Sequence, residues 1–176
     1  MDCQKNKQLI EKYPFLMPRN VFSDKVDPDY DYSYIRGIGE IPTGWENLFL
    51  QMCEELRKQL IKDNYLEKFR FTQIKEKYNR MECYHNGCSE AAQRILDKYE
   101  HLAYHICTVC GKPATVETCG YVASYCDEHY KKYGYGKTIP VDNNFGYRII
   151  KYVNGKKEYK KVSFLREWKK YQKTLT

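Results

Sequence analysis

The chain has 176 residues and a mean hydropathy of −0.79, and 42% of its residues are hydrophobic and 30% charged. This composition excludes a disordered chain, and no apolar run approaches the ~20 residues that a membrane helix needs. The net charge of +7 belongs to residues 151–176, which hold nine lysines and arginines and two acids, whereas the other 150 residues hold 21 basic and 21 acidic residues. An acidic partner is therefore a hypothesis about the C-terminal end alone.

The beginning of the chain carries no sign of export. Residues 1–12 are charged and lack the apolar region of a signal peptide, so we expect a cytoplasmic protein. In a reducing cytosol, the eight cysteines do not predict a disulfide framework.

In chain order, residues 3–12 are expected to form a short helix, which the prolines after it stop. Residues 13–42 carry prolines, acids and tyrosines without a helical period, which predicts an extended, aromatic-rich segment packed over the body. Thr43-Gly44-Trp45-Glu46 has the pattern of a capping box. Apolar residues at helical spacing after it predict a helix to about Asp63.

The sequence pattern in the middle of the chain predicts a β-hairpin and a second long helix. Residues 69–78 and 81–84 look like two strands joined by a turn at Asn79-Arg80. The helix is expected after Asn86-Gly87, and its apolar stripe leads straight into Cys107.

At the C-terminal end, residues 147–153 and 156–162 flank Asn154-Gly155, the strongest short-range signal for a β-hairpin. A last helix is expected to begin at Ser163. The basic and aromatic residues of this end are candidate binding residues: Arg148, Tyr152, Lys156, Lys157, Tyr159, Lys160, Lys161, Lys169 and Lys170.

These residues have three interpretations. Lysines and arginines can meet phosphates while a tyrosine stacks on a base, as in nucleic-acid binding. A lysine-rich hairpin edge can instead protect against edge-to-edge pairing. Finally, the charge can match an acidic patch on a protein and act mainly on the association rate.

The most informative pattern is C-x2-C-x15-C-x2-H, formed by Cys107, Cys110, Cys126 and His129. This spacing is close to that of zinc sites, and Gly111 allows the backbone to turn beneath the metal. Two short strands are expected around Cys119-Gly120, followed by a helical turn from Cys126 (a treble-clef layout). Four protein ligands close the tetrahedron around one zinc ion, which predicts a structural site.

The same cysteines and histidines allow other interpretations. The four residues can be buried free cysteines and a histidine, and Cys119 or His105 can replace one of the ligands. Cys83 and Cys88 are interpreted as core or surface thiols, because no second ligand pair lies nearby in the sequence.

The predicted fold is α+β, with helices packed on short antiparallel hairpins. Residues 1–106 are expected to form an N-terminal α+β body, residues 107–135 a zinc module packed on it, and residues 136–176 the basic hairpin and helix. No nucleophile motif, phosphate-binding loop or open metal site is visible, so we do not expect an enzyme. The 18 tyrosines are candidates for contact surfaces or for packing.

Five strings occur in order between residues 13 and 130: YPFLMPRN, DYDYSYI, IPTGWENLFLQMCEEL, QIKEKYNRMECY and CTVCGKPATVETCGYVASYCDEH. In this order they resemble a set of small zinc-binding proteins encoded by phages and mobile elements of Firmicutes. The resemblance carries a ligand role onto Cys107, Cys110, Cys126 and His129, but not onto Cys119.

The resemblance also implies a function. Some proteins of this kind are similar to anti-CRISPR proteins, so the expected role is to bind and inhibit a host defence protein in the host cytosol, most concretely a type II CRISPR effector nuclease. The alternative is a zinc-stabilised DNA- or RNA-binding phage regulator that uses the basic C-terminal end. A metal-dependent hydrolase ranks behind both.

Overall fold

The computed structural model describes residues 3–141, 146–153, 156–163 and 173, with only the backbone described for the two ranges between 146 and 163. The helices are α1 (Cys3–Lys12), α2 (Glu46–Lys62), α3 (Glu90–Tyr104) and α4 (Asp127–Tyr133), with 3-10 turns η1 (Pro14–Leu16) and η2 (Thr43–Trp45). The strands are β1 (Phe71–Lys77), β2 (Arg80–His85), β3 (Val116–Thr118), β4 (Ser124–Tyr125), β5 (Thr138–Pro140), β6 (Gly146–Val153) and β7 (Lys156–Ser163).

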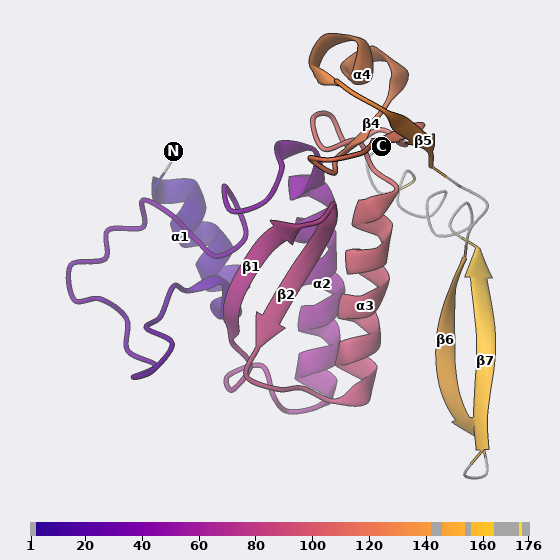
Figure 1. The fold of residues 1–176 in the computed structure, drawn as a ribbon. Coiled ribbons are helices and arrows are strands. Elements are labelled where there is room, and N and C mark those ends of the chain that lie inside the picture. Colours follow the sequence, from indigo (N-terminus) through magenta and orange to yellow (C-terminus); the bar gives the residue numbers. More distant parts are fainter. Residues whose placement is uncertain (1–2, 142–145, 154–155, 164–172, 174–176) are drawn as a thin grey trace.

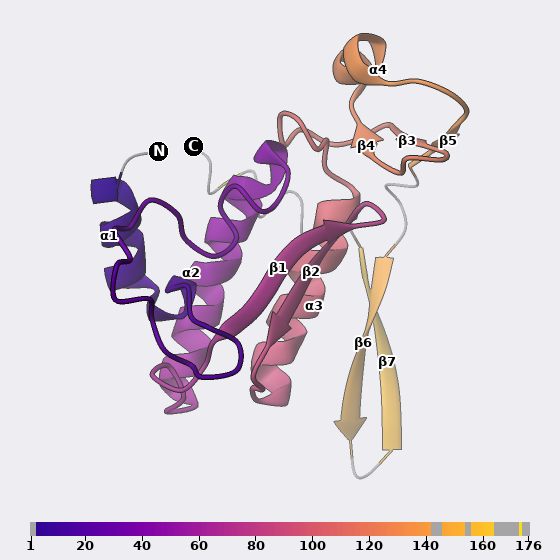
Figure 2. The same cartoon turned by 60° about the vertical axis from the view of Figure 1, so that its left-hand side comes forward.

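The body (residues 3–106) has two layers. Helices α2 and α3 lie side by side, and the antiparallel β1–β2 hairpin covers one face of the pair (Figure 1). Helix α1 and the irregular segment after it lie at the other edge, beside α2 (Figure 2). The α+β class and its small antiparallel sheets are therefore confirmed.

The core of the body consists of large side chains from all of these elements. Helix α2 contributes one stripe of buried apolar side chains at a period of 3.6 residues, and the β1–β2 hairpin contributes alternate side chains of each strand. The irregular N-terminal segment closes the core with side chains as buried as those of the helices. The largest fully buried residues are Trp45, Phe15, Phe49, Phe69, Leu16, Ile35, Leu48, Met52, Leu56, Leu60 and Ile74.

The metal module (residues 107–141) sits beyond one end of α2 and α3 (Figure 1). Its sheet has the order β4-β3-β5, and α4 follows β4 directly. Strands β3 and β4 confirm the predicted pair around Cys119-Gly120, although they are shorter than expected. Strand β5 was not predicted; its residues come from the part that the sequence assigned to the basic C-terminal end.

Two local predictions are wrong. The Thr43 side chain does not cap a helix: residues 43–45 form η2, and α2 begins at Glu46 without a side-chain cap. The β1–β2 turn lies at Tyr78-Asn79, one residue earlier than predicted, and both residues have a positive φ. In both places a contact with the metal module, described below, decides the backbone conformation.

The C-terminal hairpin has the predicted register, with Val153 opposite Lys156 and Lys151 opposite Glu158. Asn154-Gly155 and the predicted last helix lie outside the described residues, apart from Lys173. No helix within the described part of the chain is both long and apolar enough to cross a membrane.

Candidate metal centre

The first two candidate ligands lie on a tight turn between α3 and β3. The amide of Gly111 donates to the carbonyl of Cys107 at 3.0 Å, and the amide of Cys107 donates to the carbonyl of Lys112 at 2.8 Å. Gly111 has a φ of 74°, which residues with a side chain rarely adopt. This turn brings the sulfurs of Cys107 and Cys110 close to the other two ligands.

The other two ligands lie at the beginning of α4. Cys126 is the N-cap residue, and His129 follows within the first turn of the helix. The His129 ring stacks on that of Tyr133 with centroids 5.9 Å apart, which fixes the orientation of the imidazole. A short strand that leads into a short helix thus supplies both ligands.

The four predicted side chains meet at one point. Their ligand atoms all lie within 4.8 Å of one another. Nδ1 of His129 is 3.3 Å from the sulfur of Cys126 and 3.6 Å from that of Cys107, and the sulfurs of Cys110 and Cys126 are 3.9 Å apart. Three cysteines and one histidine arranged in this way can bind one metal ion.

The backbone of the site favours a thiolate. Burial opposes ionisation of Cys107, but amide groups of Cys126, Val109 and Cys110 point at its sulfur, and its pKa lies below the ordinary value. Burial, together with the neighbouring Cys107 and Cys126 sulfurs, raises the pKa of Cys110 to about 11. Since a bound metal needs the thiolates, metal binding here releases protons and weakens in acid.

The metal module is joined to the body by direct backbone packing. The amide of Gly44, in η2, donates to the carbonyl of Thr108 at 2.9 Å. Next to it, Nε1 of Trp45 donates to the carbonyl of Ile106, the last residue of the body, at 3.3 Å. A Cβ at position 44 would lie 2.2 Å from the carbonyl oxygen of Cys107. This contact explains why residues 43–45 do not form a capping box.

A second contact ties the tip of the β1–β2 hairpin to the same module. Asn79 is fully buried; its side-chain amide donates to Oγ of Ser124 at 2.6 Å, and its side-chain oxygen accepts the amide of Ser124 at 3.0 Å. Oγ of Ser124 in turn donates to the carbonyl of Tyr104. These bonds hold Asn79 as the second residue of the turn, whereas the prediction made it the first, so Tyr78 lies in the turn and Arg80 lies in β2.

The remaining cysteines and histidines lie outside the cluster. Cys119 is exposed near the end of β3, and His105 is buried at the end of α3, so neither replaces a ligand in the Cys107–His129 cluster. Cys83 is buried and Cys88 half-buried, in line with the interpretation as core and surface thiols. The predicted binding residues between Arg148 and Lys161 lie on β6 and β7, where only the backbone is described, and Lys169 and Lys170 lie outside the described residues.

The body also contains a cavity of about 720 Å³ between β2 and α3. Burial raises the pKa of Glu100 in its wall, and burial lowers the pKa of the adjacent His101. The thiol of Cys83, which lines the cavity, is buried beside Glu100, and burial raises its pKa well above the ordinary value. An activated nucleophilic cysteine has a lowered pKa instead.

No protein-family model, no curated protein and no solved structure matches this chain.

Proposed function

We propose that the protein is a non-enzymatic, zinc-stabilised binding protein that acts by docking on another protein. The donor set supports zinc, since thiolates combined with one imidazole suit a tetrahedral zinc ion. With Zn–S bonds of about 2.3 Å and a Zn–N bond of about 2.0 Å, a tetrahedron has edges of about 3.5–3.8 Å. Three of the six distances between the ligand atoms, 3.3, 3.6 and 3.9 Å, are close to these edges, and all the ligand atoms lie within 4.8 Å of one another.

The proposed zinc has a structural role. Four protein ligands leave no position for a water molecule or a substrate, and closed sites of this kind stabilise a fold. The order of the elements, a cysteine turn followed by a hairpin and a helix that begins at a ligand, supports a treble-clef-like module.

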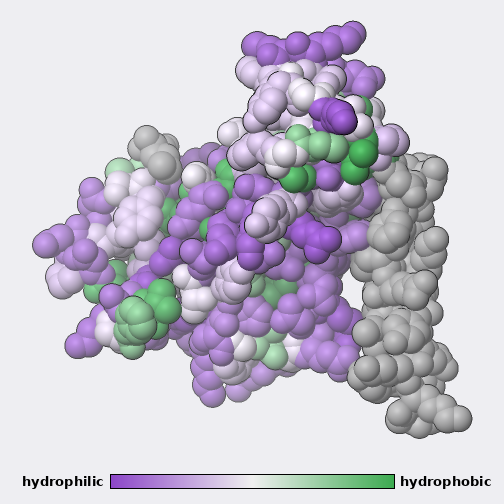
Figure 3. Space-filling view, in the orientation of Figure 1, coloured by the Kyte–Doolittle hydropathy of each residue, from purple (hydrophilic) through white to green (hydrophobic). Residues whose placement is uncertain are grey.

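The observation that carries a protein-binding role is an exposed apolar turn in the body. Phe22 is 99% exposed and Val21 beside it is 61% exposed, on the loop that follows η1, where a small hydrophobic patch stands out on the surface (Figure 3). A large aromatic side chain kept in water loses the free energy that its burial would supply. Aromatic residues of this kind are typical anchors of protein interfaces.

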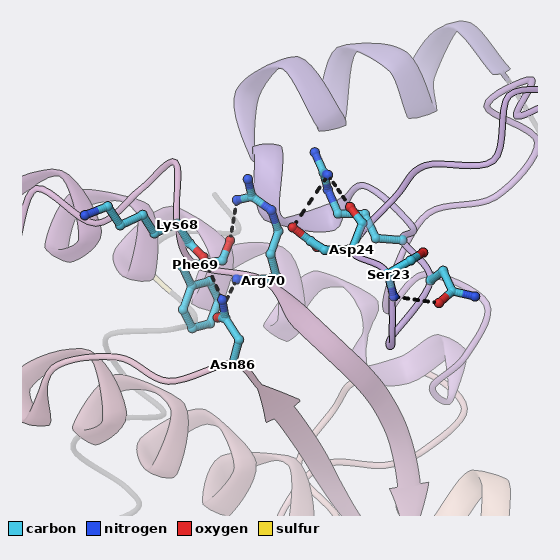
Figure 4. A network of polar contacts seen from close by, with 8 residues as sticks. Ser23, Asp24, Lys68, Phe69, Arg70 and Asn86 are labelled. Atoms are coloured by element: carbon cyan, nitrogen blue, oxygen red, sulfur yellow. Dashed lines mark hydrogen bonds and ion pairs between the residues drawn. The ribbon is translucent and has the colours of Figure 1, made fainter.

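The turn is held in one conformation by polar contacts (Figure 4). Oδ1 of Asn20 accepts the amides of Phe22 and Ser23 at 3.0 Å each, and Nη1 of Arg19 donates to the carbonyl of Asp24 at 2.7 Å. A preformed turn loses little conformational entropy when it docks.

A hollow of about 500 Å³ lies beside this turn and adds a second feature typical of an interface. Tyr30 and Tyr34 line it with their rings packed edge to face at 5.4 Å, and Tyr34 is exposed. The surface that combines the Val21-Phe22 turn with this hollow offers both a projection and a recess to a partner.

The specific form of the proposal is the one implied by the resemblance: the partner is a host defence protein, most concretely a type II CRISPR effector nuclease. Purified protein is then expected to inhibit DNA cleavage by such a nuclease. The substitution Phe22→Ser should weaken the inhibition about tenfold or more, as expected for a hot-spot residue, at an unchanged melting temperature.

The matched control is Ile61→Ser, which removes an apolar side chain 49% exposed on α2, away from the turn. This variant should inhibit like the wild type. Wild-type protein that leaves cleavage by several type II nucleases unchanged would overturn the identity of the partner. Equal inhibition by the Phe22 variant and the wild type would overturn the docking surface.

The alternative function is nucleic-acid binding through the basic C-terminal end. The net charge of +7 favours it, because this charge is concentrated in residues 151–176. This range begins within β6 and includes all of β7. Neutralising Lys156, Lys157, Lys160 and Lys161 would then abolish a salt-dependent gel shift with bare nucleic acid.

A further inference from the structure

A second surface of the body carries a row of charged and aromatic side chains. In the register of β1 and β2, Gln73 lies opposite Tyr84, Lys75 opposite Glu82, and Lys77 opposite Arg80. Residues directly opposite in an antiparallel pair share a face, so these six side chains stand on the outer face, opposite to the face that packs into the core. Three of them on the edge strand β2, Arg80, Glu82 and Tyr84, also line the cavity between β2 and α3. The inner face carries Ile74, Met81 and Cys83, which are buried. The outer face is turned to the viewer in Figure 1 and is largely hydrophilic in Figure 3.

The cations of this face are not neutralised. Lys77 and Arg80 are directly opposed and exposed, and within the part of the chain that the structure describes neither forms an ion pair. Like charges opposite each other destabilise a hairpin. The one acid of the row, Glu82, accepts a hydrogen bond of 2.6 Å from the hydroxyl group of Tyr84. The carboxylates of Glu76 and Glu117 bond to Asn79 in the turn, so among the described residues the two opposed cations have no ion-pair partner.

An aromatic ring stands at each end of these cations. Nζ of Lys75 lies 5.0 Å from the centre of the Tyr84 ring, and Nζ of Lys77 lies 5.9 Å from that of Tyr78. The tyrosine at position 84 is exposed, and the one at 78 is 75% exposed. Along β2, Tyr84 lies four residues from Arg80, which forms the last cross-strand pair before the turn, and four residues of strand span about 14 Å.

The Tyr78 backbone is strained for a bulky residue. Its φ is 50°, a left-handed conformation that Asn or Gly adopts at a lower cost. Its neighbour Asn79 also has a positive φ, but the buried hydrogen bonds to Ser124 explain that residue. Among the described residues, the Tyr78 ring gains no comparable buried contact, and its position is fixed by its neighbour Asn79. A strained, exposed aromatic residue points to a binding role.

We propose that the outer face of the β1–β2 hairpin binds single-stranded nucleic acid, with Tyr84 and Tyr78 stacking on bases and Lys77 and Arg80 contacting the phosphates between them. Alternating rings and cations match the alternation of bases and phosphates in a single strand, and stacking needs bases that are not paired. Phosphate supplies the anion that the opposed cations lack.

The surroundings restrict the path of the strand. Arg80 and Tyr84 lie at the β2 wall of the cavity between β2 and α3, but the carboxyl groups of Glu82, Asp97 and Glu100 line the same cavity and repel phosphate. The strand therefore follows the hairpin itself and does not enter the cavity. An acidic peptide would satisfy the cations as well, but it would leave the two rings unused.

The test uses the full-length, metal-loaded chain and the fluorescence anisotropy of fluorescein-labelled dT12 and U12. Replacing both Lys77 and Arg80 by Gln should weaken binding of both probes, and lower the slope of log K against log salt by roughly 1.4, about 0.7 for each phosphate contact. The control Lys62→Gln/Lys68→Gln removes the same charge from exposed positions near the end of α2 and should leave the slope unchanged.

The tyrosines give a sharper test, because stability and binding should change in opposite directions. Tyr78→Asn relieves the backbone strain, so the melting temperature should stay or rise while the affinity falls about tenfold. Tyr84→Leu should weaken binding by a similar factor, and Tyr84→Phe, which keeps the ring, should bind within about twofold of the wild type. A lower melting temperature and unchanged affinity for Tyr78→Asn would indicate a purely structural residue and overturn the proposal.

Three other results would also overturn it. The first is no binding of either probe at low salt. The second is binding that survives all the hairpin substitutions and disappears when Lys156, Lys157, Lys160 and Lys161 are neutralised, which would assign it to the basic C-terminal end. The third is binding of a poly-glutamate peptide that depends on the same lysine and arginine but not on the tyrosines.

Discussion

Different interactions stabilise the body and the metal module. The body buries large aromatic and aliphatic side chains from α2, α3, the β1–β2 hairpin and the N-terminal segment in one core. Within the described residues of the metal module, the buried hydrophobic side chains are small: Cys107, Ala114, Ala123, Cys126 and Val141. At ~25 cal/mol per Å² of apolar area, such side chains supply little of the free energy of folding. A region without a core of its own needs a metal or a neighbouring domain to fold. For this module, the candidates are the metal site and the packing against the body.

Metal removal should separate the two regions most strongly. Structural zinc supplies on the order of 10 kcal/mol to small zinc-binding domains. We expect chelation, or Cys126→Ser, to remove amide protection from residues 107–141 and to leave α2 and α3 protected, as measured by hydrogen exchange with mass spectrometry. Metal analysis should give about one zinc per chain.

The control for this experiment is Cys119→Ser, which changes a thiol that is exposed and outside the cluster. It should keep both the metal and the protection pattern. Full protection of residues 107–141 after the metal has been removed would contradict the role of the metal. Loss of protection throughout the body would mean that the two regions are a single folding unit.

The contact between the regions can be tested with Gly44→Ala. The new Cβ would lie 2.2 Å from the carbonyl oxygen of Cys107, so the turn that carries two ligands must move. We expect a loss of roughly 1–3 kcal/mol in the free energy of unfolding, together with weaker metal binding, measured by urea denaturation and by competition with a chelating dye.

Gly120→Ala is the comparison for this variant. No atom lies within 4 Å of the added Cβ, but the φ of 96° disfavours a side chain, so the cost should be only about 1 kcal/mol. If Gly44→Ala costs no more than Gly120→Ala and binds metal normally, the packing between the regions does not matter for stability.

The smallest effect belongs to the body alone and depends on pH. Lys12 lies 3.0 Å from the carboxylate of Glu54, and this contact, together with Tyr13 and Lys58, lowers the pKa of Glu54 to about 2. Because the pKa is lowered in the folded state, the stabilisation is present above about pH 4.3 and is lost as the pH falls toward 2. The group is partly exposed, so we expect at most about 1 kcal/mol.

Denaturation curves of the wild type and Glu54→Gln between pH 6 and pH 2 would measure this effect. Release of the metal in acid affects both proteins equally and cancels in their difference. The wild type should lose more stability than the variant over this range. Parallel curves would show that the contact between α1 and α2 is worth nothing measurable.

Local patterns predicted much of the molecule. The helices α2 and α3 follow from apolar stripes, and the register of the β6–β7 hairpin follows from a two-residue turn. The four clustered ligands follow from their spacing, because short cysteine and histidine pairs can reach one ion only in a few backbone conformations. The resemblance to phage proteins, and the inhibitory role that it implies, stay predictions.

The failures have a common cause. Thr43-Gly44-Trp45-Glu46 has the letters of a capping box, but the amide of Gly44 bonds to Thr108, 64 residues further along the chain. The hairpin turns at Tyr78-Asn79 because Asn79 bonds to Ser124, and β5 forms because β3 has a free edge. No window of sequence contains both partners of such contacts.

The sequence by itself therefore determined the helical stripes, the ligand set and the position of the net charge, because each depends on residues a few positions apart. Tertiary structure decided how the metal module meets the body, which turn residue is buried and which is strained, and where aromatic rings stay in water. Those features depend on which distant segments exclude water from each other, and only the folded chain brings these segments into contact.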